Sequence, residues 1–241
     1  MRYRFEQRQD WTHFSSGRVL HNYPGAPAFP ARLASELFQR CAALLAKGGR
    51  SEPYTLYDPC CGGAHLLTVI GLLHGAKLAA IMASDVEPQA LEFAAKNLAL
   101  LDRDGLQARR QKLIRDEQKF GKPSHADAVK SADWLRELPL FAGGSVQTFV
   151  FAADAAQLEL SSLPRRPEIM LTDLPYGHLV QWQGGEPGQL LAKWAEVIQP
   201  GGAMAVVYPK KQRLAVPPHV QVEEALQVGH RRLLIMTTSP T

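Results

Sequence analysis

Cysteine is scarce in this chain, and the positions of the few cysteines exclude two kinds of stabilised fold. The 241 residues include only Cys41, Cys60 and Cys61, with no C-x-x-C pair. A disulfide-based scaffold and a structural zinc site are therefore not expected. The eight histidines show no H-E-x-x-H or comparable spacing, so the sequence predicts no metal site.

Long apolar segments are also missing. The longest apolar run, residues 66–73, ends at His74 and is too short to cross a bilayer. The first eight residues contain no apolar stretch typical of a secretion signal. Hydrophobic residues make up 46% of the chain and charged residues 21%, as in ordinary soluble globular proteins. We therefore expect a cytoplasmic protein with no membrane partner.

Strand and helix patterns alternate along most of the chain. Short apolar segments predict strands, and apolar residues recurring every three or four positions predict helices. This alternation favours an α/β fold, a mostly parallel sheet with helices on both faces. With a terminal antiparallel pair the sheet has seven strands, at 54–57, 78–84, 146–152, 169–172, 204–208, 219–228 and 231–237. After a first helix that opens at Pro30, the predicted helices lie at 64–75, 88–101 and 187–198.

Two segments stand outside this alternation in a chain that we expect to form a single domain, residues 1–241. Residues 1–29 are polar and contain several glycines and prolines, which predicts an extended N-terminal arm. Residues 103–145 predict a helical insertion with a break at 121–123. Between 103 and 136 there are nine Lys or Arg and five Asp or Glu, so the local excess equals the net charge of +4 of the whole chain. That excess is a weak indication of an anionic partner.

The first strand runs into a glycine turn at D-P-C-C-G-G-A, residues 58–64. At the carboxyl end of a parallel strand, glycine lets the backbone approach a ligand closely. The dinucleotide pattern G-x-G-x-x-G is absent, and the carboxylate of Asp58 would repel a diphosphate. The carboxylate suits an ammonium group instead, such as the one that S-adenosylmethionine carries. A purely structural turn is the alternative at this point.

Acidic residues follow the next two strands. Asp85 lies 23 residues after Gly62, and a carboxylate at this spacing can accept hydrogen bonds from both ribose hydroxyls of a nucleoside. A helix cap is the alternative role of Asp85. Asp154 follows the third strand and can accept a hydrogen bond from an adenine amine. Cys60, in the glycine turn, and Val86, next to Asp85, complete the predicted cofactor contacts.

The fourth strand is followed by T-D-L-P-Y-G, residues 172–177. Asp173 and the carbonyl of Leu174 are two acceptors that can orient an amine or ring N–H of a base. Pro175 stiffens the turn, and Tyr176 offers an aromatic face on which a base can stack. We predict catalytic roles for Asp173 and Tyr176, a cofactor contact for Asp173, and substrate contacts for Leu174, Pro175 and Tyr176. A simple turn is the alternative.

Together these motifs resemble the class I S-adenosylmethionine-dependent methyltransferases. More narrowly, the chain resembles the avilamycin-resistance ribosomal RNA methyltransferase family in D-P-C-C-G-G-A-H-L-L-T-V-I-G-L-L-H, S-D-V-E-P-Q-A-L-E-F-A-A-K-N-L-A-L-L, F-G-K-P-S and T-D-L-P-Y-G. The resemblance extends from about Phe29 to Pro209 and implies a Rossmann-like fold with S-adenosyl-L-methionine as cofactor. It carries binding roles over to Asp58, Gly62, Asp85, Asp154 and Asp173.

The resemblance also implies a substrate, a guanine of 23S ribosomal RNA with ring nitrogen N1 favoured, and a role in resistance to an orthosomycin antibiotic. Methylation of the guanine exocyclic amine N2 stays open. So does methylation of an adenine amine, which is disfavoured by Leu174 where that motif usually has proline. A non-catalytic RNA-binding protein with this fold is a further alternative, against which the intact carboxylates argue. Methylation at cytosine C5 needs a cysteine nucleophile near the fourth strand, and no cysteine lies beyond Cys61.

Basic residues are the predicted contacts to ribosomal RNA, and we expect a monomer to bind it. Arg109 and Arg110 lie in the insertion, and Lys210 and Lys211 follow the fifth strand. Cations beside the ligand-binding strand ends can hold RNA phosphates, which position a substrate without reading its sequence. Most clusters of charged residues are simply solvent-exposed surface, and this is the alternative interpretation of these residues.

Overall fold

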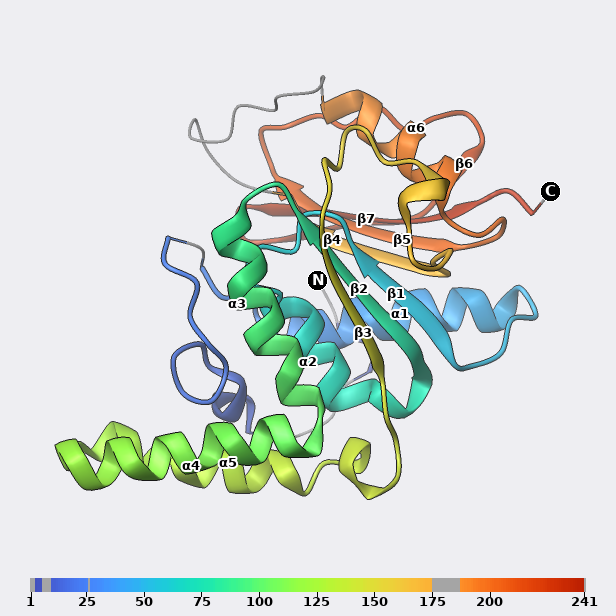
Figure 1. The fold of residues 1–241 in the computed structure, drawn as a ribbon. Coiled ribbons are helices and arrows are strands. Elements are labelled where there is room, and N and C mark those ends of the chain that lie inside the picture. Colours follow the sequence, from blue (N-terminus) through green and yellow to red (C-terminus); the bar gives the residue numbers. More distant parts are fainter. Residues whose placement is uncertain (1–2, 6–9, 26, 175–186, 241) are drawn as a thin grey trace.

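Seven strands form one sheet in this computed structural model, which describes residues 3–5, 10–25, 27–174 and 187–240. They are β1 Tyr54–Asp58, β2 Leu78–Asp85, β3 Gln147–Ala152, β4 Ile169–Asp173, β5 Ala203–Pro209, β6 Val220–Val228 and β7 Arg231–Thr238. Their order across the sheet is β3-β2-β1-β4-β5-β7-β6 (Figure 1). The first five in this order are parallel, and β7 is antiparallel to both β5 and β6. The predicted α/β fold with a mostly parallel seven-stranded sheet is confirmed.

Helices cover both faces of the sheet. α1 Ala31–Lys47, α2 His65–His74 and α3 Pro88–Leu98 pack on one face, and α6 Pro187–Val197 packs on the other. Successive strand residues point to opposite faces: Leu171 of β4 joins the cluster of α1–α3, whereas Met170 packs in the cluster that contains Trp194 of α6. In the described part of the chain, no helix is long and apolar enough to span a membrane.

The insertion is a helical hairpin at one end of the molecule (Figure 1). Its helices are α4 Arg103–Phe120 and α5 Pro123–Arg136. Asp102 caps α4, with Oδ2 accepting hydrogen bonds from the backbone N–H groups of Asp104 at 2.9 Å and Gly105 at 3.2 Å. α4 ends at Phe120 and is followed by Gly121, whose φ of +60° is a left-handed conformation that glycine adopts readily. The predicted break at 121–123 is confirmed.

The described part of the N-terminal segment is packed rather than extended, so the prediction of an extended polar arm was wrong for these residues. Residues Trp11–Phe14 form a 3-10 helix, and Phe14, Val19 and Leu20 are buried in the core. The ring of His13 stacks on Trp134 of α5 with a centroid distance of 4.4 Å. These few apolar and aromatic side chains attach an otherwise polar segment to the insertion and to the helices of the sheet.

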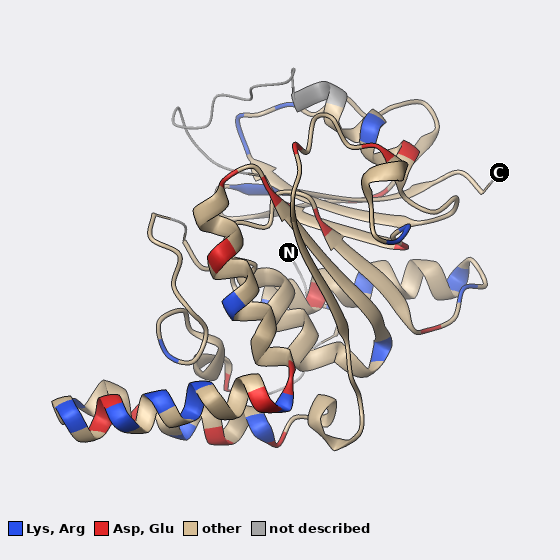
Figure 2. Ribbon diagram, viewed as in Figure 1, with Lys and Arg blue, Asp and Glu red and all other residues tan. Residues whose placement is uncertain are grey.

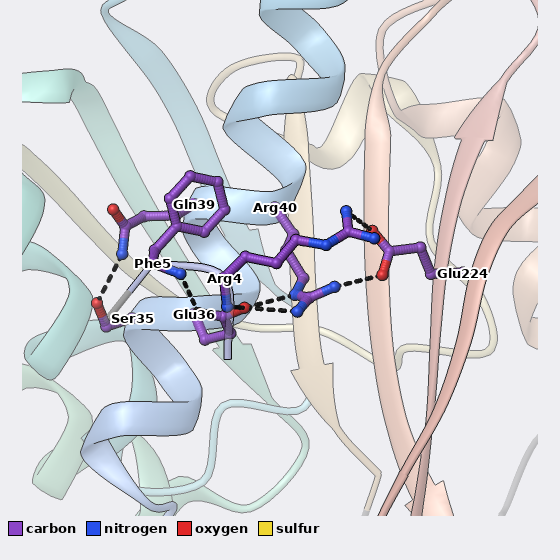
Figure 3. Close-up of polar contacts among 7 residues, drawn as sticks. All are labelled: Arg4, Phe5, Ser35, Glu36, Gln39, Arg40 and Glu224. Atoms are coloured by element: carbon purple, nitrogen blue, oxygen red, sulfur yellow. Dashed lines mark hydrogen bonds and ion pairs between the residues drawn. The ribbon is translucent and has the colours of Figure 1, made fainter. Parts of the chain in front are cut away.

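A buried ion-pair network joins α1 to the edge strand β6 (Figure 3). Nη2 of Arg40 lies 2.6 Å from Oε1 of Glu36, one helical turn earlier, and the side chains are 2% and 1% exposed. Arg40 also pairs with Glu224 of β6. The Glu36 carboxylate accepts hydrogen bonds from the backbone N–H groups of Arg4 at 2.8 Å and Phe5 at 3.0 Å. The network therefore binds three parts of the chain together.

Candidate active site

A cavity of about 740 Å³ opens at the carboxyl ends of the parallel strands. It lies where the strand order reverses, because the chain continues from β1 to β2 on one side and from β4 to β5 on the other. Crevices at such a switch point are the usual ligand sites of open α/β sheets. The seven residues predicted to contact the cofactor all line this cavity: Asp58, Cys60, Gly62, Asp85, Val86, Asp154 and Asp173. The structure thus brings them together, while their binding roles stay predictions.

The described lining of the cavity is acidic. It contains no Lys or Arg and five carboxylates, those of Asp58, Asp85, Glu87, Asp154 and Asp173. Such a lining repels a ligand that carries phosphate and attracts one that carries positive charge. Nδ1 of His65, another lining residue, is buried and has no hydrogen-bond partner within the described part of the chain.

The glycine turn is held against the end of β2. The backbone N–H of Gly62 donates to Oδ2 of Asp85 at 2.9 Å, and the N–H of Cys61 donates to the carbonyl of Ser84 at 2.9 Å. The other carboxylate oxygen of Asp85 accepts from the N–H of Glu87 at 3.0 Å. Gly62 has a φ of +51°, where a side chain would be strained. Asp85 therefore shapes the turn as well as facing the cavity.

Asp58, at the end of β1, is 3% exposed. Its Oδ1 accepts a hydrogen bond from the N–H of Cys60 at 3.0 Å. Burial raises the pKa of Asp58 to about 7, and the carboxylates of Asp85 and Asp173 act in the same direction. A cationic ligand beside Asp58 would favour its ionised form.

The segment after β4 is described only in part. The side chain of Asp173 is 18% exposed. The N–H of Leu174 donates to the carbonyl of Val207 at 2.9 Å, and its side chain is buried in the core on the α6 face. The backbone of Leu174 is therefore the part that suits a substrate contact. Pro175 and Tyr176 lie outside the described residues.

One wall of the cavity was missed by the sequence reasoning. It comes from the N-terminal segment, through Ser16, His21, Asn22, Tyr23, Gly25, Pro27, Ala28 and Phe29. The segment packs tightly on the glycine turn, since a Cβ on Gly63 would lie 2.9 Å from Cβ of Tyr23. The apolar residues Phe14, Val19 and Leu20 within this otherwise polar segment were the sequence signal that could have revealed the packing.

Comparison with known proteins decides the family. The chain matches the family described as rRNA methyltransferase AviRa over residues 1–231. The chain belongs to the AviRa family of ribosomal RNA methyltransferases. A curated relative, the 23S rRNA (guanine(2535)-N(1))-methyltransferase of Streptomyces viridochromogenes, is 41% identical over 237 residues, which is 95% of this chain and 93% of the relative.

Solved structures agree with this AviRa membership. That of rRNA methyltransferase AviRa from S. viridochromogenes matches with a TM-score of 0.84 and 41% identity, covering 98% of this chain and 96% of that one. A putative RNA methyltransferase from Pyrococcus horikoshii matches with a TM-score of 0.51 and 12% identity, over 96% of this chain and 92% of that one. This second likeness concerns the fold alone.

In this member of the AviRa family, the two predicted RNA contacts of the insertion have partners inside the protein. Arg109 donates from Nε to the carbonyl of Val19 at 2.8 Å and from Nη2 to that of Arg18 at 3.1 Å. Its guanidinium therefore holds the N-terminal segment, and an RNA contact by Arg109 stays a prediction. Arg110 pairs with Asp133 of α5. Basic and acidic residues intersperse along α4 and α5 (Figure 2), so the net charge of the insertion is spread over a mixed surface.

Asn97 of α3 is the residue that ties the N-terminal wall to the glycine turn. It is fully buried, and its Nδ2 donates to the carbonyls of His21 at 3.0 Å and Gly63 at 2.7 Å. Its Oδ1 accepts from the N–H of His21 at 2.7 Å. These bonds fix the two sides of the AviRa-family cavity relative to each other.

Replacing Asn97 with alanine should therefore lower the free energy of unfolding by about 1–3 kcal/mol, because backbone groups lose buried partners. Urea denaturation measures this loss. The control is Asn22→Ala, since Asn22 is exposed on the same segment and, within the described part of the chain, its side chain accepts one hydrogen bond, from Ser16. Equal midpoints for both variants would show that the Asn97 bonds contribute nothing.

Proposed function

We propose that this protein methylates ring nitrogen N1 of a guanine in 23S ribosomal RNA, with S-adenosylmethionine as the methyl donor. The observation that carries the proposal is the acidic cavity at the switch point of the sheet, in a chain of the AviRa family. The relative from S. viridochromogenes is named for methylation of a guanine at N1. Protection of the ribosome against an orthosomycin antibiotic is the role that we propose for the modification.

The residues of the cavity fit this cofactor. S-adenosylmethionine is a nucleoside with two cationic groups and no phosphate, so it suits a lining of carboxylates without Lys or Arg. The volume of about 740 Å³ is typical of small-molecule sites. We assign Asp58 to the ammonium group, Asp85 to the ribose hydroxyls and Asp154 to the adenine amine. When bound, S-adenosylmethionine supplies an electrophilic methyl group on a positively charged sulfur, which leaves as a neutral thioether.

Asp173 acts on the RNA base. Its carboxylate accepts the N1–H of the guanine and takes up that proton as the nitrogen is methylated. The carbonyl of Leu174 accepts from the exocyclic amine, which fixes the orientation of the base. Tyr176 is assigned to stacking on the base, an interaction worth roughly 1–3 kcal/mol. The rate of this reaction depends more on the proximity and orientation of the guanine and the methyl group than on the strength of Asp173 as a proton acceptor.

The target guanine must leave its stack or come from a loop, because N1 is otherwise occupied in base pairing. The test is to incubate the protein with unmodified 23S ribosomal RNA and S-adenosylmethionine and to map the product by mass spectrometry. We expect N1-methylguanosine at one position, and much slower formation of it with Asp173→Asn. N2-methylguanosine or a methylated adenosine would contradict the N1 assignment. RNA binding without any methylation would favour a non-catalytic role.

Lys210 and Lys211 are the exposed lysines that we assign to RNA phosphates. They directly follow β5, at the same edge of the sheet as the cavity. The N–H of Lys210 donates to the carbonyl of His230 at 2.9 Å, which fixes this segment on the turn between β6 and β7 without engaging the ammonium group.

Changing Lys210 or Lys211 to glutamate should weaken RNA binding. The slope of log affinity against log salt should fall by about 0.7–0.9 for each phosphate that the protein no longer neutralises. Binding assays over a salt series measure both quantities. Lys47→Glu is the matched control, since Lys47 is exposed at the end of α1, near the opposite edge of the sheet. A salt slope equal to that of Lys47→Glu would mean that both lysines are merely solvated.

A further inference from the structure

Arg231 begins β7 at the edge of the sheet where the cavity opens. In the antiparallel pairing of β5 and β7, Arg231 lies opposite Pro209, the last residue of β5. Asp173 lies opposite Val207 on the other side of β5. The two residues are therefore separated by a single strand, and both stand at the carboxyl ends of the parallel strands.

The side chain of Arg231 reaches back across β5 to Asp173. Nη2 of Arg231 is 3.8 Å from Oδ2 of Asp173, and the side chains are 22% and 18% exposed. On another side, the guanidinium lies over the ring of Phe29, 5.5 Å from its centroid. Phe29 is 4% exposed and lines the cavity. The guanidinium is thus placed between the carboxylate and an aromatic ring that belongs to the cavity wall.

The charges around Asp173 make this cation significant. The carboxylates of Asp173 and Asp85 are near enough to Asp58 to raise its pKa. The described lining of the cavity contains no Lys or Arg that could offset these charges. Arg231 lies just beyond the lining, and through its ion pair with Asp173 it places a positive charge beside these carboxylates.

We propose that Arg231 is a positioning residue for the methyl-transfer reaction, acting through Asp173. The inference rests on the function proposed above for Asp173. Its guanidinium fixes the direction of Oδ2, so that the carboxylate is oriented to accept the N1–H of the guanine. The positive charge also lies close to the base while its ring nitrogen passes the proton to Asp173 and carries negative charge until it is methylated.

The neighbouring Arg232 provides a matched control. It lies on the same strand with the same charge, but its side chain is on the opposite face of the sheet and is exposed. If the positive charge of β7 acted only by a general attraction for RNA, replacing either arginine would have the same effect. An effect that acts through Asp173 should appear only when Arg231 is replaced.

The experiment compares Arg231→Met, Arg231→Lys and Arg232→Met in single-turnover methylation of a 23S ribosomal RNA fragment. Cofactor affinity is measured by calorimetry with S-adenosylmethionine, RNA affinity by filter binding, and folding by thermal melting. Arg231→Met should lower the methylation rate by about tenfold or more while both affinities stay within about twofold of wild type, because the interaction matters most as the proton is transferred. Arg231→Lys should recover part of the rate, and Arg232→Met should methylate at the wild-type rate.

The variant Asp173→Asn separates the inference from the function on which it rests. In that background, Arg231→Met should lower the rate little further, since the two residues act as one unit. A wild-type rate in Asp173→Asn would overturn the proposed role of Asp173 itself. If Asp173→Asn is slow but Arg231→Met methylates as fast as Arg232→Met, the role of Asp173 stands and that of Arg231 is overturned. A loss confined to RNA affinity in Arg231→Met would also overturn it.

Discussion

Replacing Arg40 with alanine should lower the free energy of unfolding by about 3–5 kcal/mol, the usual cost of removing one partner from a buried ion pair. Two carboxylates, those of Glu36 and Glu224, would lose their shared cation, and Glu36 is almost completely buried. The variant would also hold α1 less firmly against β6. Urea denaturation followed by circular dichroism measures the change.

Two variants control this measurement. Arg4→Ala removes the other cation beside Glu224, but the Arg4 side chain is 62% exposed, so we expect a loss of less than about 1 kcal/mol. Arg40→Met combined with Glu36→Gln and Glu224→Gln removes the charges together and should recover much of the stability. If Arg40→Ala and Arg4→Ala were equally stable, the buried network would have no part in holding α1 to the sheet.

The ion-pair network also shows where sequence patterns stop being informative. On a helix, Glu36 and Arg40 look like an ordinary pair of solvated charges one turn apart. Their burial depends on Glu224, which is 184 residues from Arg40 and meets it only in the folded sheet. No local pattern predicts a partner at that distance.

The parallel strands were predictable because they follow local rules. Buried strands read as short apolar runs, and their carboxyl ends must meet at one edge of the sheet. Asp58, Asp85, Asp154 and Asp173 could therefore be expected to lie together from their positions alone. The packing of residues 10–25 depends instead on contacts such as Arg109 with Val19, which join segments 90 residues apart. An arginine that makes such internal hydrogen bonds looks the same in sequence as one that is only solvated.

Replacing Asp58 with asparagine should stabilise the ligand-free protein at neutral pH and remove most of its affinity for S-adenosylmethionine. Burial raises the pKa of Asp58 to about 7 from an ordinary value of 3.8. Between these values Asp58 is more protonated in the folded protein than in the unfolded chain, so its contribution to the free energy of unfolding falls as pH rises from about 4 to about 7. The full difference corresponds to about 4 kcal/mol. Asparagine has no charge to bury, and its side-chain oxygen can still accept the hydrogen bond from Cys60.

Cofactor binding should show the opposite dependence on pH. The ammonium group favours the ionised carboxylate, so the affinity of the wild type should fall by about tenfold for each pH unit below 7, as protonation of Asp58 competes. Calorimetric titrations between about pH 5.5 and 7.5, together with thermal melting of the ligand-free protein, measure both effects. Asp58→Asn should bind weakly at every pH, and its melting temperature should exceed that of the wild type by an amount that grows as pH rises toward 7. The control Asp154→Asn should keep both pH dependences, since it leaves the buried carboxylate of Asp58 in place. An affinity in Asp58→Asn equal to that of the wild type would remove Asp58 from the cofactor site and leave its burial as a purely structural feature.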